Sequence, residues 1–313
     1  MTQYIIKRLL QAVVVIIGVL FFTFALLQLT GDPARATLPL DADPEAVEQM
    51  RQKLRLDEPI PVQFYYYILN VLKGDFGDSL TYKHQPAREI VFERLPATIQ
   101  LALSAWITII VTSLIIGMIA AIRRGSIIDN ISMVFAMFGQ CLPSFWLGLM
   151  LILLFAVTLK VLPTSGRQGW DLRYLILPTL TISAPSIAVM TRIVRSGMLE
   201  VLNKDYILTA RSKGLNGRVI FFRHALKNVA IPLVTLYSLQ LGGLLSGSMI
   251  TETIFGWPGV GLLSVNAIGT RDFPIVSAVV FYVATGFVLI NLFVDILYTY
   301  LDPRVRLQGK EVS

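Results

Sequence analysis

Residues 205–228 read DYILTARSKGLNGRVIFFRHALKN, a basic stretch broken by glycine that lies between two long apolar runs. Its second half carries four apolar residues at helical spacing: Val219, Ile220, Phe222 and Leu226. We expect helices over 205–210 and 218–227, with Gly214 as a positive-φ cap that ends the first. Ala210 is small enough for a partner chain to approach closely. The stretch therefore predicts a knuckle of two short helices between membrane spans.

The composition of the chain indicates a membrane protein. Of 313 residues, 55% are hydrophobic and only 15% are charged, with a mean hydropathy of +0.67. A net charge of +7 can also indicate a nucleic-acid partner, but the cations gather at the ends of apolar runs, where they orient a polytopic protein. We therefore expect an all-α membrane protein that binds no nucleic acid. Cys141 is the single cysteine, which excludes an internal disulfide and a thiolate metal cluster.

Six apolar stretches are long enough to cross the hydrocarbon core, which takes about 20 helical residues. The expected spans are residues 9–29, 97–122, 131–159, 174–192, 229–250 and 276–300. Pro143, Pro178 and Pro185 lie inside these spans, and we expect kinks there. The first span could instead be a cleaved signal peptide. Its apolar run is longer than the core of such a signal, so we expect a retained helix.

The short loops carry cations unequally, which predicts orientation. One set of loops holds fifteen: Lys7, Arg8, Arg123, Arg124, Arg192, Arg195, Lys204, Arg211, Lys213, Arg218, Arg223, Lys227, Arg304, Arg306 and Lys310. The opposite set holds four: Lys160, Arg167, Arg173 and Arg271. Both termini are therefore expected in the cytoplasm. We divide the chain into an N-terminal helix (1–30), an extracytoplasmic region (31–95) with short helices at 47–54 and 63–72, a five-helix core (96–301) and a tail (302–313).

Short motifs follow one another along the chain. The basic stretch carries Tyr206-x-x-Thr209-Ala210-Arg211-x-Lys213-Gly214-Leu215, then His224-x-Leu226-x-Asn228 and Ile231-Pro232. Elsewhere the chain carries Lys7-Arg8-Leu9-Leu10, Gly31-Asp32-Pro33-Ala34, Leu56-Asp57-x-Pro59, Gly74-Asp75-Phe76-Gly77-x-Ser79, Leu95-Pro96-Ala97-Thr98, Glu252-x-x-Phe255-x-x-Pro258-Gly259-x-Gly261, Arg271-Asp272-x-Pro274, Asp295-x-x-Tyr298 and Asp302-Pro303-Arg304. In this order they resemble the dipeptide/oligopeptide/nickel permease family of ABC importers. The general permease motif is altered: Leu208 and Thr209 replace Glu and Ala, and Lys227 replaces Pro.

The resemblance implies a type I ABC importer permease fold in the bacterial inner membrane. It implies a related permease subunit, two cytoplasmic ATPase domains and an external solute-binding protein as partners. It also implies that residues 198–228 couple to the ATPases, through Thr209, Ala210, Arg211, Lys213, Gly214, Leu215, Arg218 and His224. The chain contains no G-x-x-x-x-G-K-S/T phosphate loop, so we expect it to bind no cofactor and ATP and Mg to be held by the partner ATPases.

Several polar residues lie near the expected spans. Glu252, Trp257 and Pro258 belong either to a capped outer loop or to a partly re-entrant segment that forms the outer gate or touches the binding protein, and we favour the re-entrant segment. Gln140 and Ser144 flank Pro143 on one face of the expected helix and are candidates to line the solute path. Four further residues have structural expectations: Arg192 and Arg195 as orientation anchors, Asp295 in an ion pair with a loop arginine, and His224 as a packing residue in a different compartment from His84.

Three alternatives stay open. The basic knuckle also suits an amphipathic helix that lies on anionic lipid. The chain could be a self-contained channel or secondary transporter for a small solute, but no internal repeat supports this. An intramembrane enzyme would need a catalytic set that the sequence does not offer. The expected solute is a small peptide or a similar compound, such as a glutathione-like molecule, a nickel chelate or an opine.

Overall fold

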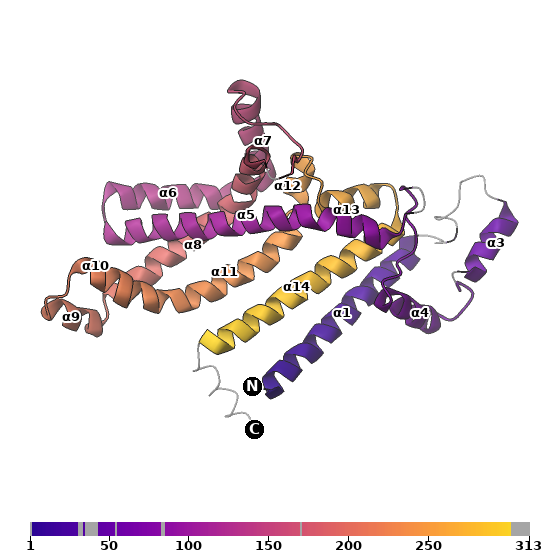
Figure 1. The fold of residues 1–313 in the computed structure, drawn as a ribbon, viewed down its shortest axis with the longest axis horizontal. Helices are drawn as coiled ribbons and strands as arrows, with labels where there is room; N and C mark the ends of the chain where they lie inside the picture. Colours follow the sequence, from indigo (N-terminus) through magenta and orange to yellow (C-terminus); the bar gives the residue numbers. More distant parts are fainter. Residues whose placement is uncertain are drawn as a thin grey trace. The chain divides into compact units, whose positions relative to one another are not determined.

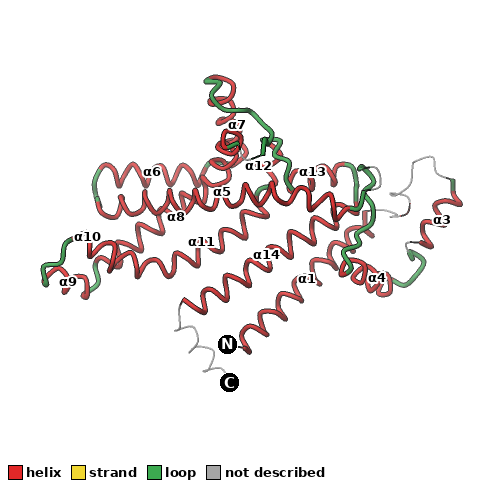
Figure 2. The backbone as a smooth tube through the Cα atoms, in the orientation of Figure 1, coloured by secondary structure: helices red, strands yellow, loops and turns green. Residues whose placement is uncertain are grey.

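The computed structural model describes residues 2–30, 34, 43–53, 55–82, 85–169 and 171–301 (Figure 1). Within them the regular structure is helical, apart from one isolated bridge between Asp78 and Pro86 (Figure 2). The all-α prediction is confirmed. His84 and the tail 302–313 lie outside the described residues.

The helices follow in this order: α1 (Thr2–Thr30), α3 (Pro44–Lys53), α4 (Ile60–Leu72), α5 (Ala87–Ile122), α6 (Ile127–Cys141), α7 (Ser144–Leu151), the π-helix η1 (Ile152–Thr158), α8 (Leu172–Leu202), α9 (Asp205–Ser212), α10 (Gly217–Val219), the π-helix η2 (Ile220–Leu226), α11 (Lys227–Gly247), α12 (Met249–Ile254), α13 (Val260–Gly269) and α14 (Phe273–Leu301). The two short helices expected before the second span are present as α3 and α4. Helix α5 begins ten residues earlier than expected, with Pro96 inside it.

Four helices are long and apolar enough to cross a membrane unbroken, and two bent pairs bring the number to six if each pair is one span. The unbroken segments are Ile6–Leu26, Ala87–Ile122, Leu172–Leu202 and Phe273–Ile296. The bent pairs are Ile127–Cys141 with Ser144–Thr158, and Gly217–Ala230 with Pro232–Leu245. The four unbroken segments overlap four of the spans expected from hydropathy, and the two bent pairs overlap the third and fifth, the latter beginning twelve residues before its expected start.

The third expected span is broken at Pro143 rather than kinked. Helix α6 ends at Cys141, Leu142 is extended with ψ 127°, and the two helical axes differ by 107°. Proline disfavours the helical conformation in the residue before it and has no N–H to continue the helix, which explains the break. Gln140 and Ser144 therefore lie on different helices, and the expectation that they share one helix face is wrong.

The chain forms two compact units, one of which comprises Thr98–Pro258 and Phe293–Ser313. Its described core joins α5, α8, η2 and α11. The buried side chains include Ile109 from α5, Met190 and Val194 from α8 and Phe221 from η2. At Gly117 of α5 an added Cβ would lie 2.7 Å from the Val194 side chain, so only glycine permits this approach of α5 to α8.

The other unit comprises Met1–Ala97 and Gly259–Leu292, and it is therefore discontinuous in sequence. Its core joins the first turns of α5 to α13 and α14 through Val91, Leu263 and Ile275. Helix α4 packs against α1 through aromatic rings, with the Phe64 ring 5.5 Å from that of Phe21. The extracytoplasmic region predicted from sequence thus shares a core with residues nearly 200 positions later.

Candidate functional site

Helix α9 ends as the sequence predicts, at a glycine with positive φ. Gly214 has φ +76°, its N–H donates to the carbonyl of Arg211 at 2.9 Å, and the N–H of Leu215 donates to the carbonyl of Ala210 at 3.3 Å. This pair of bonds satisfies carbonyls that the end of a helix leaves open. An added Cβ at Gly214 would meet nothing within 4 Å, so the backbone angle alone requires glycine.

The second half of the stretch differs from the prediction of a separate short helix. Asn216 caps a new helix by accepting from the N–H of Arg218 at 3.0 Å. The segments α10, η2 and α11 then follow without a gap, so residues 217–247 form one helical run with a π-helical part at Ile220–Leu226 and a bend of 51° near Pro232. The second half of residues 205–228 is therefore the start of the fifth span. Within this stretch only α9 is a separate short helix (Figure 1).

A small core of its own holds the knuckle, residues 205–228, together. Ile207, Ala210 and Ile220 are buried against one another, with Leu202 packed beside them. Ala210 is only 8% exposed, so the expectation that a partner approaches it directly is wrong. The Asn228 amide ties the two helices by donating to the Tyr206 hydroxyl at 2.9 Å and to the carbonyl of His224 at 2.8 Å.

The outer surface of the knuckle is both cationic and apolar. Among the predicted coupling residues, the exposed ones are Thr209, Arg211, Lys213, Gly214, Leu215 and Arg218, whereas His224 is half-buried. Large apolar side chains lie among them, with Leu208 61% and Phe222 59% exposed. The buried core is small, and these side chains face away from it.

A buried ion pair joins α6 to α8, and the sequence did not predict it. Arg195 donates from Nε to Asp129 Oδ1 at 2.5 Å and from Nη2 to Oδ2 at 2.7 Å, and the N–H of Gly125 donates to Oδ2 at 2.9 Å. Asp129 is 2% exposed. Arg195 is thus a structural ion-pair partner and not only an orientation anchor, whereas Arg192 is exposed as expected. Asp129, at the third position of α6 after its Ser126 cap, gave no sequence signal beyond helix capping.

The residues expected at an outer gate are mostly inside the protein. Glu252 is fully buried and accepts from Thr98 Oγ1 at 2.8 Å and from Ser248 Oγ at 2.9 Å. Trp257 is also buried, and its N–H donates to the carbonyl of Glu252 at 2.8 Å, while Pro258 is half-buried. Glu252 and Trp257 are therefore interior residues of this chain, and their part in an outer gate stays a prediction.

Comparison with known proteins decides the family. The family model for the binding-protein-dependent transport system inner membrane component matches residues 113–307, and the model for the N-terminal part of such membrane components matches residues 1–102. The chain belongs to this permease family. It is a multi-pass inner-membrane permease component of an ATP-driven importer.

Curated relatives of the permease align over almost its whole length. The glutathione transport system permease protein GsiC of Salmonella typhimurium (strain LT2) is 41% identical over 308 residues, which cover 98% of this chain and 99% of the relative. GsiC of Escherichia coli (strain K12) is 40% identical over the same coverage. An inward-facing structure of the MetNI methionine ABC transporter matches with a TM-score of 0.55 and 16% identity, over 68% of this chain and 96% of that one. That structure supports the fold alone.

In the permease, two motifs far apart in sequence meet at one buried carboxylate. Asp272, fully buried before α14, accepts from Ser79 Oγ at 2.6 Å and from the N–H of Thr81 at 3.0 Å through Oδ2. Its Oδ1 accepts from the N–H of Ile275 at 3.4 Å, which caps α14. The Gly74–Ser79 and Arg271–Pro274 motifs therefore specify one structural joint.

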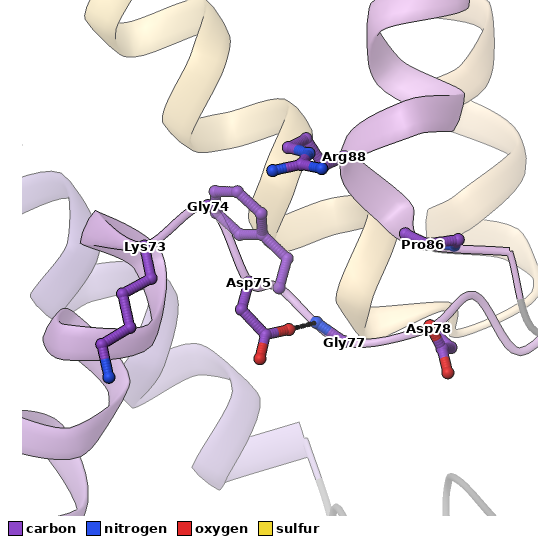
Figure 3. Close-up of a pocket in the computed structure, with 8 residues that line it drawn as sticks. Lys73, Gly74, Asp75, Gly77, Asp78, Pro86 and Arg88 are labelled. Carbon is purple, nitrogen blue, oxygen red and sulfur yellow. Dashed lines mark hydrogen bonds between the residues drawn. The ribbon is translucent and has the colours of Figure 1, made fainter.

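The turn that leads into this joint borders a cavity of about 220 Å³ (Figure 3). Gly74 and Gly77 have φ of +74° and +85°, and the N–H of Gly77 donates to Asp75 Oδ1 at 3.0 Å. Figure 3 shows Lys73 directed away from Arg88, which extends from α5 beside Gly74. The charged groups do not converge on one point, so this cavity offers no built ligand site. No group of three metal-ligating side chains occurs among the described residues either.

Proposed function

We propose that the knuckle docks this permease onto the ATPase subunits of its importer. The observation that carries the proposal is the surface of the knuckle: exposed apolar side chains set among Arg211, Lys213 and Arg218. Such a mixture suits a protein interface, in which apolar anchors are surrounded by charged residues. The internal core of Ile207, Ala210 and Ile220 supports it, because a packed unit transmits a displacement better than a loose loop.

The direct attachment of the knuckle to a span favours transmission into the membrane. The contacts of Ile220 and the bond from Asn228 to Tyr206 join α9 to the helical run that continues into α11, so a push on α9 reaches the part of that run before its bend near Pro232. ATP-driven movement of the partner ATPases would thereby switch the permease between its inward-facing and outward-facing states. The chain would hydrolyse no ATP itself, and ATP and Mg would be bound by the partners.

The proposed solute is a small peptide. The support is the 41% identity to a permease named for the transport of glutathione. Glutathione is a tripeptide. We further propose a paralogous permease as the second membrane subunit, a binding protein outside, and both termini in the cytoplasm, on the side of the cation-rich loops. Glu252, Trp257 and Pro258 are proposed as internal parts of the outer gate, and Gln140 and Ser144 as path-lining groups on either side of the α6–α7 break.

The test exploits two glycines of the same segment. Gly214→Val introduces a β-branched residue at positive φ, which costs about 1–3 kcal/mol. Gly217→Val is the matched control, since Gly217 also has open space but no positive φ. We expect Gly214→Val to insert and accumulate normally yet to lose the ATPase subunits on co-purification and to lose uptake. Gly217→Val should retain both, and Gly214→Asn should recover most of the loss, because Asn tolerates this backbone region.

The competing lipid-surface role predicts the reverse. Lipid attachment would depend on charge, so an Arg218→Gln/Arg223→Gln double variant would be more harmful than Gly214→Val. Normal ATPase retention and uptake in Gly214→Val would refute the docking role.

A further inference from the structure

Two polar side chains meet deep within the spans of the permease. Ser186 is the fifteenth of the 31 residues of α8, and Gln240 lies seven residues before the end of α11. At about 1.5 Å per residue, Ser186 lies more than 20 Å from either end of its helix. Ser186 Oγ donates to Gln240 Oε1 at 3.2 Å, so Gln240 lies at the same depth, near the middle of the membrane.

The bond to Ser186 uses only one side of the Gln240 carboxamide. A carboxamide carries one acceptor oxygen and two N–H donors. Among the described residues no hydrogen bond uses Gln240 Nε2, and this atom is not among the buried atoms that lack a partner. Gln240 is half-buried. Its two donors are therefore open at the surface of this chain, in an orientation that Ser186 fixes.

The surface beside these donors is open. Gly243 lies three residues further along α11, on the same side of the helix as Gln240, and is exposed. An added Cβ there would meet nothing within 4 Å. A ligand can thus approach the α11 backbone next to the carboxamide.

Lipid cannot occupy this position without cost. An N–H donor left without a partner in hydrocarbon costs several kcal/mol, so these donors face water, solute or another protein chain. The oxygen already accepts one hydrogen bond whereas both N–H donors are open, which favours a ligand rich in acceptors. Peptides carry carbonyl oxygens at every residue and a terminal carboxylate.

We propose that Gln240 lines the solute path and donates hydrogen bonds to carbonyl or carboxylate oxygens of the passing peptide, with Ser186 as the positioning residue that holds its carboxamide. This rests on the proposed function of the chain as a peptide importer. It adds a site for the solute within the membrane, where the proposed function specifies only docking and energy coupling.

The first test asks whether water reaches Gln240. In a Cys141→Ser background, which removes the single and exposed cysteine, Gln240→Cys is treated with a charged methanethiosulfonate reagent in the assembled transporter, without nucleotide and with ATP and vanadate. Val234→Cys serves as an exposed control on another face of α11, and Leu233→Cys as a buried control. We expect at least tenfold faster labelling of Gln240→Cys than of either control in at least one state. Equal or absent labelling in both states would overturn the proposal and indicate contact with lipid or a partner chain.

The second test asks what the carboxamide does, with radiolabelled glutathione as the probe. Gln240→Leu should lower uptake about tenfold while ATPase retention stays normal, which separates it from Gly214→Val. Ser186→Ala should raise the apparent KM about threefold with little change in kcat, and Ser186→Thr should restore it. Unchanged uptake in Gln240→Leu would overturn the donor role. If the unaltered permease carries no glutathione, the proposed solute is wrong, and the labelling still decides whether Gln240 lines the path.

Discussion

The ion pair between Asp129 and Arg195 should contribute strongly to the packing of α6 on α8. Arg195→Met leaves a carboxylate that is 2% exposed, with the Gly125 N–H as a remaining donor. Breaking a buried pair by removing one partner costs about 3–5 kcal/mol. The Arg195 side chain is 25% exposed, so water reaches the pair from that side. We therefore expect Arg195→Met to lower the free energy of unfolding by about 3 kcal/mol, the lower end of that range.

The assay is thermal unfolding of the purified permease in detergent. A loss of about 3 kcal/mol should lower the midpoint by roughly 6 °C, since each kcal/mol shifts a large domain by about 2 °C. Arg192→Met is the control: Arg192 lies one turn earlier on α8 and is exposed, so its loss should shift the midpoint by less than about 1 °C.

A double-mutant cycle separates the pair from its surroundings. Asp129→Leu should also destabilise, because it removes the pair and the acceptor of the Gly125 N–H. The Asp129→Leu/Arg195→Met double variant should lose about 2 kcal/mol less stability than the two single losses added together, since an apolar pair can replace a buried ion pair. The recovery stays incomplete because the Gly125 bond remains lost. Additive losses, or a midpoint unchanged in Arg195→Met, would refute this account of the α6–α8 contact.

Three further predictions concern other parts of the permease. Asp272→Ala should cost about 1–3 kcal/mol, since Ser79 Oγ and the N–H of Thr81 lose their buried acceptor, and a thermal midpoint equal to that of the unaltered chain would contradict this. A reporter fused after Ser313 should be active in the cytoplasm, and a cysteine placed at Tyr65, which is exposed in α4, should react with an impermeant reagent from outside; labelling of the C-terminus from outside would overturn the orientation. The purified chain alone should hydrolyse no ATP above a mock preparation, because it lacks a phosphate loop, and turnover that follows the protein through purification would disprove the division of labour.

Hydropathy and local signals predicted much of the fold. The four unbroken spans were expected close to their observed places, because an apolar run of about 20 residues has few alternatives in a membrane protein, whereas the bends in the other two were not. The positive φ of Gly214 was also predicted, since a helix followed by a glycine commonly ends in this way. Both features depend on residues close together in sequence.

The features that the sequence did not reveal depend on tertiary contacts. Asp129 and Arg195 are 66 positions apart, and each alone suggests only a cap or an anchor. Glu252 was expected in an outer loop or gate. Its burial could not be predicted because Thr98, which donates to its carboxylate, lies 154 positions away in the sequence. Proline was equally ambiguous: Pro178 and Pro185 lie inside the unbroken α8, whereas Pro143 separates two helices by 107°. Surrounding packing decides whether a helix continues through proline.

The joint at Asp272 has a consequence for synthesis of the chain. Ser79 and Thr81 leave the ribosome about 190 residues before the carboxylate that binds them, and the unit they belong to resumes only at Gly259. Translation at about 5–20 residues per second leaves that unit incomplete for roughly 10–40 s. In this interval the start of α5 is without the α13 and α14 residues that complete its core, and a chain that ends before Gly259 lacks both Leu263 and Ile275.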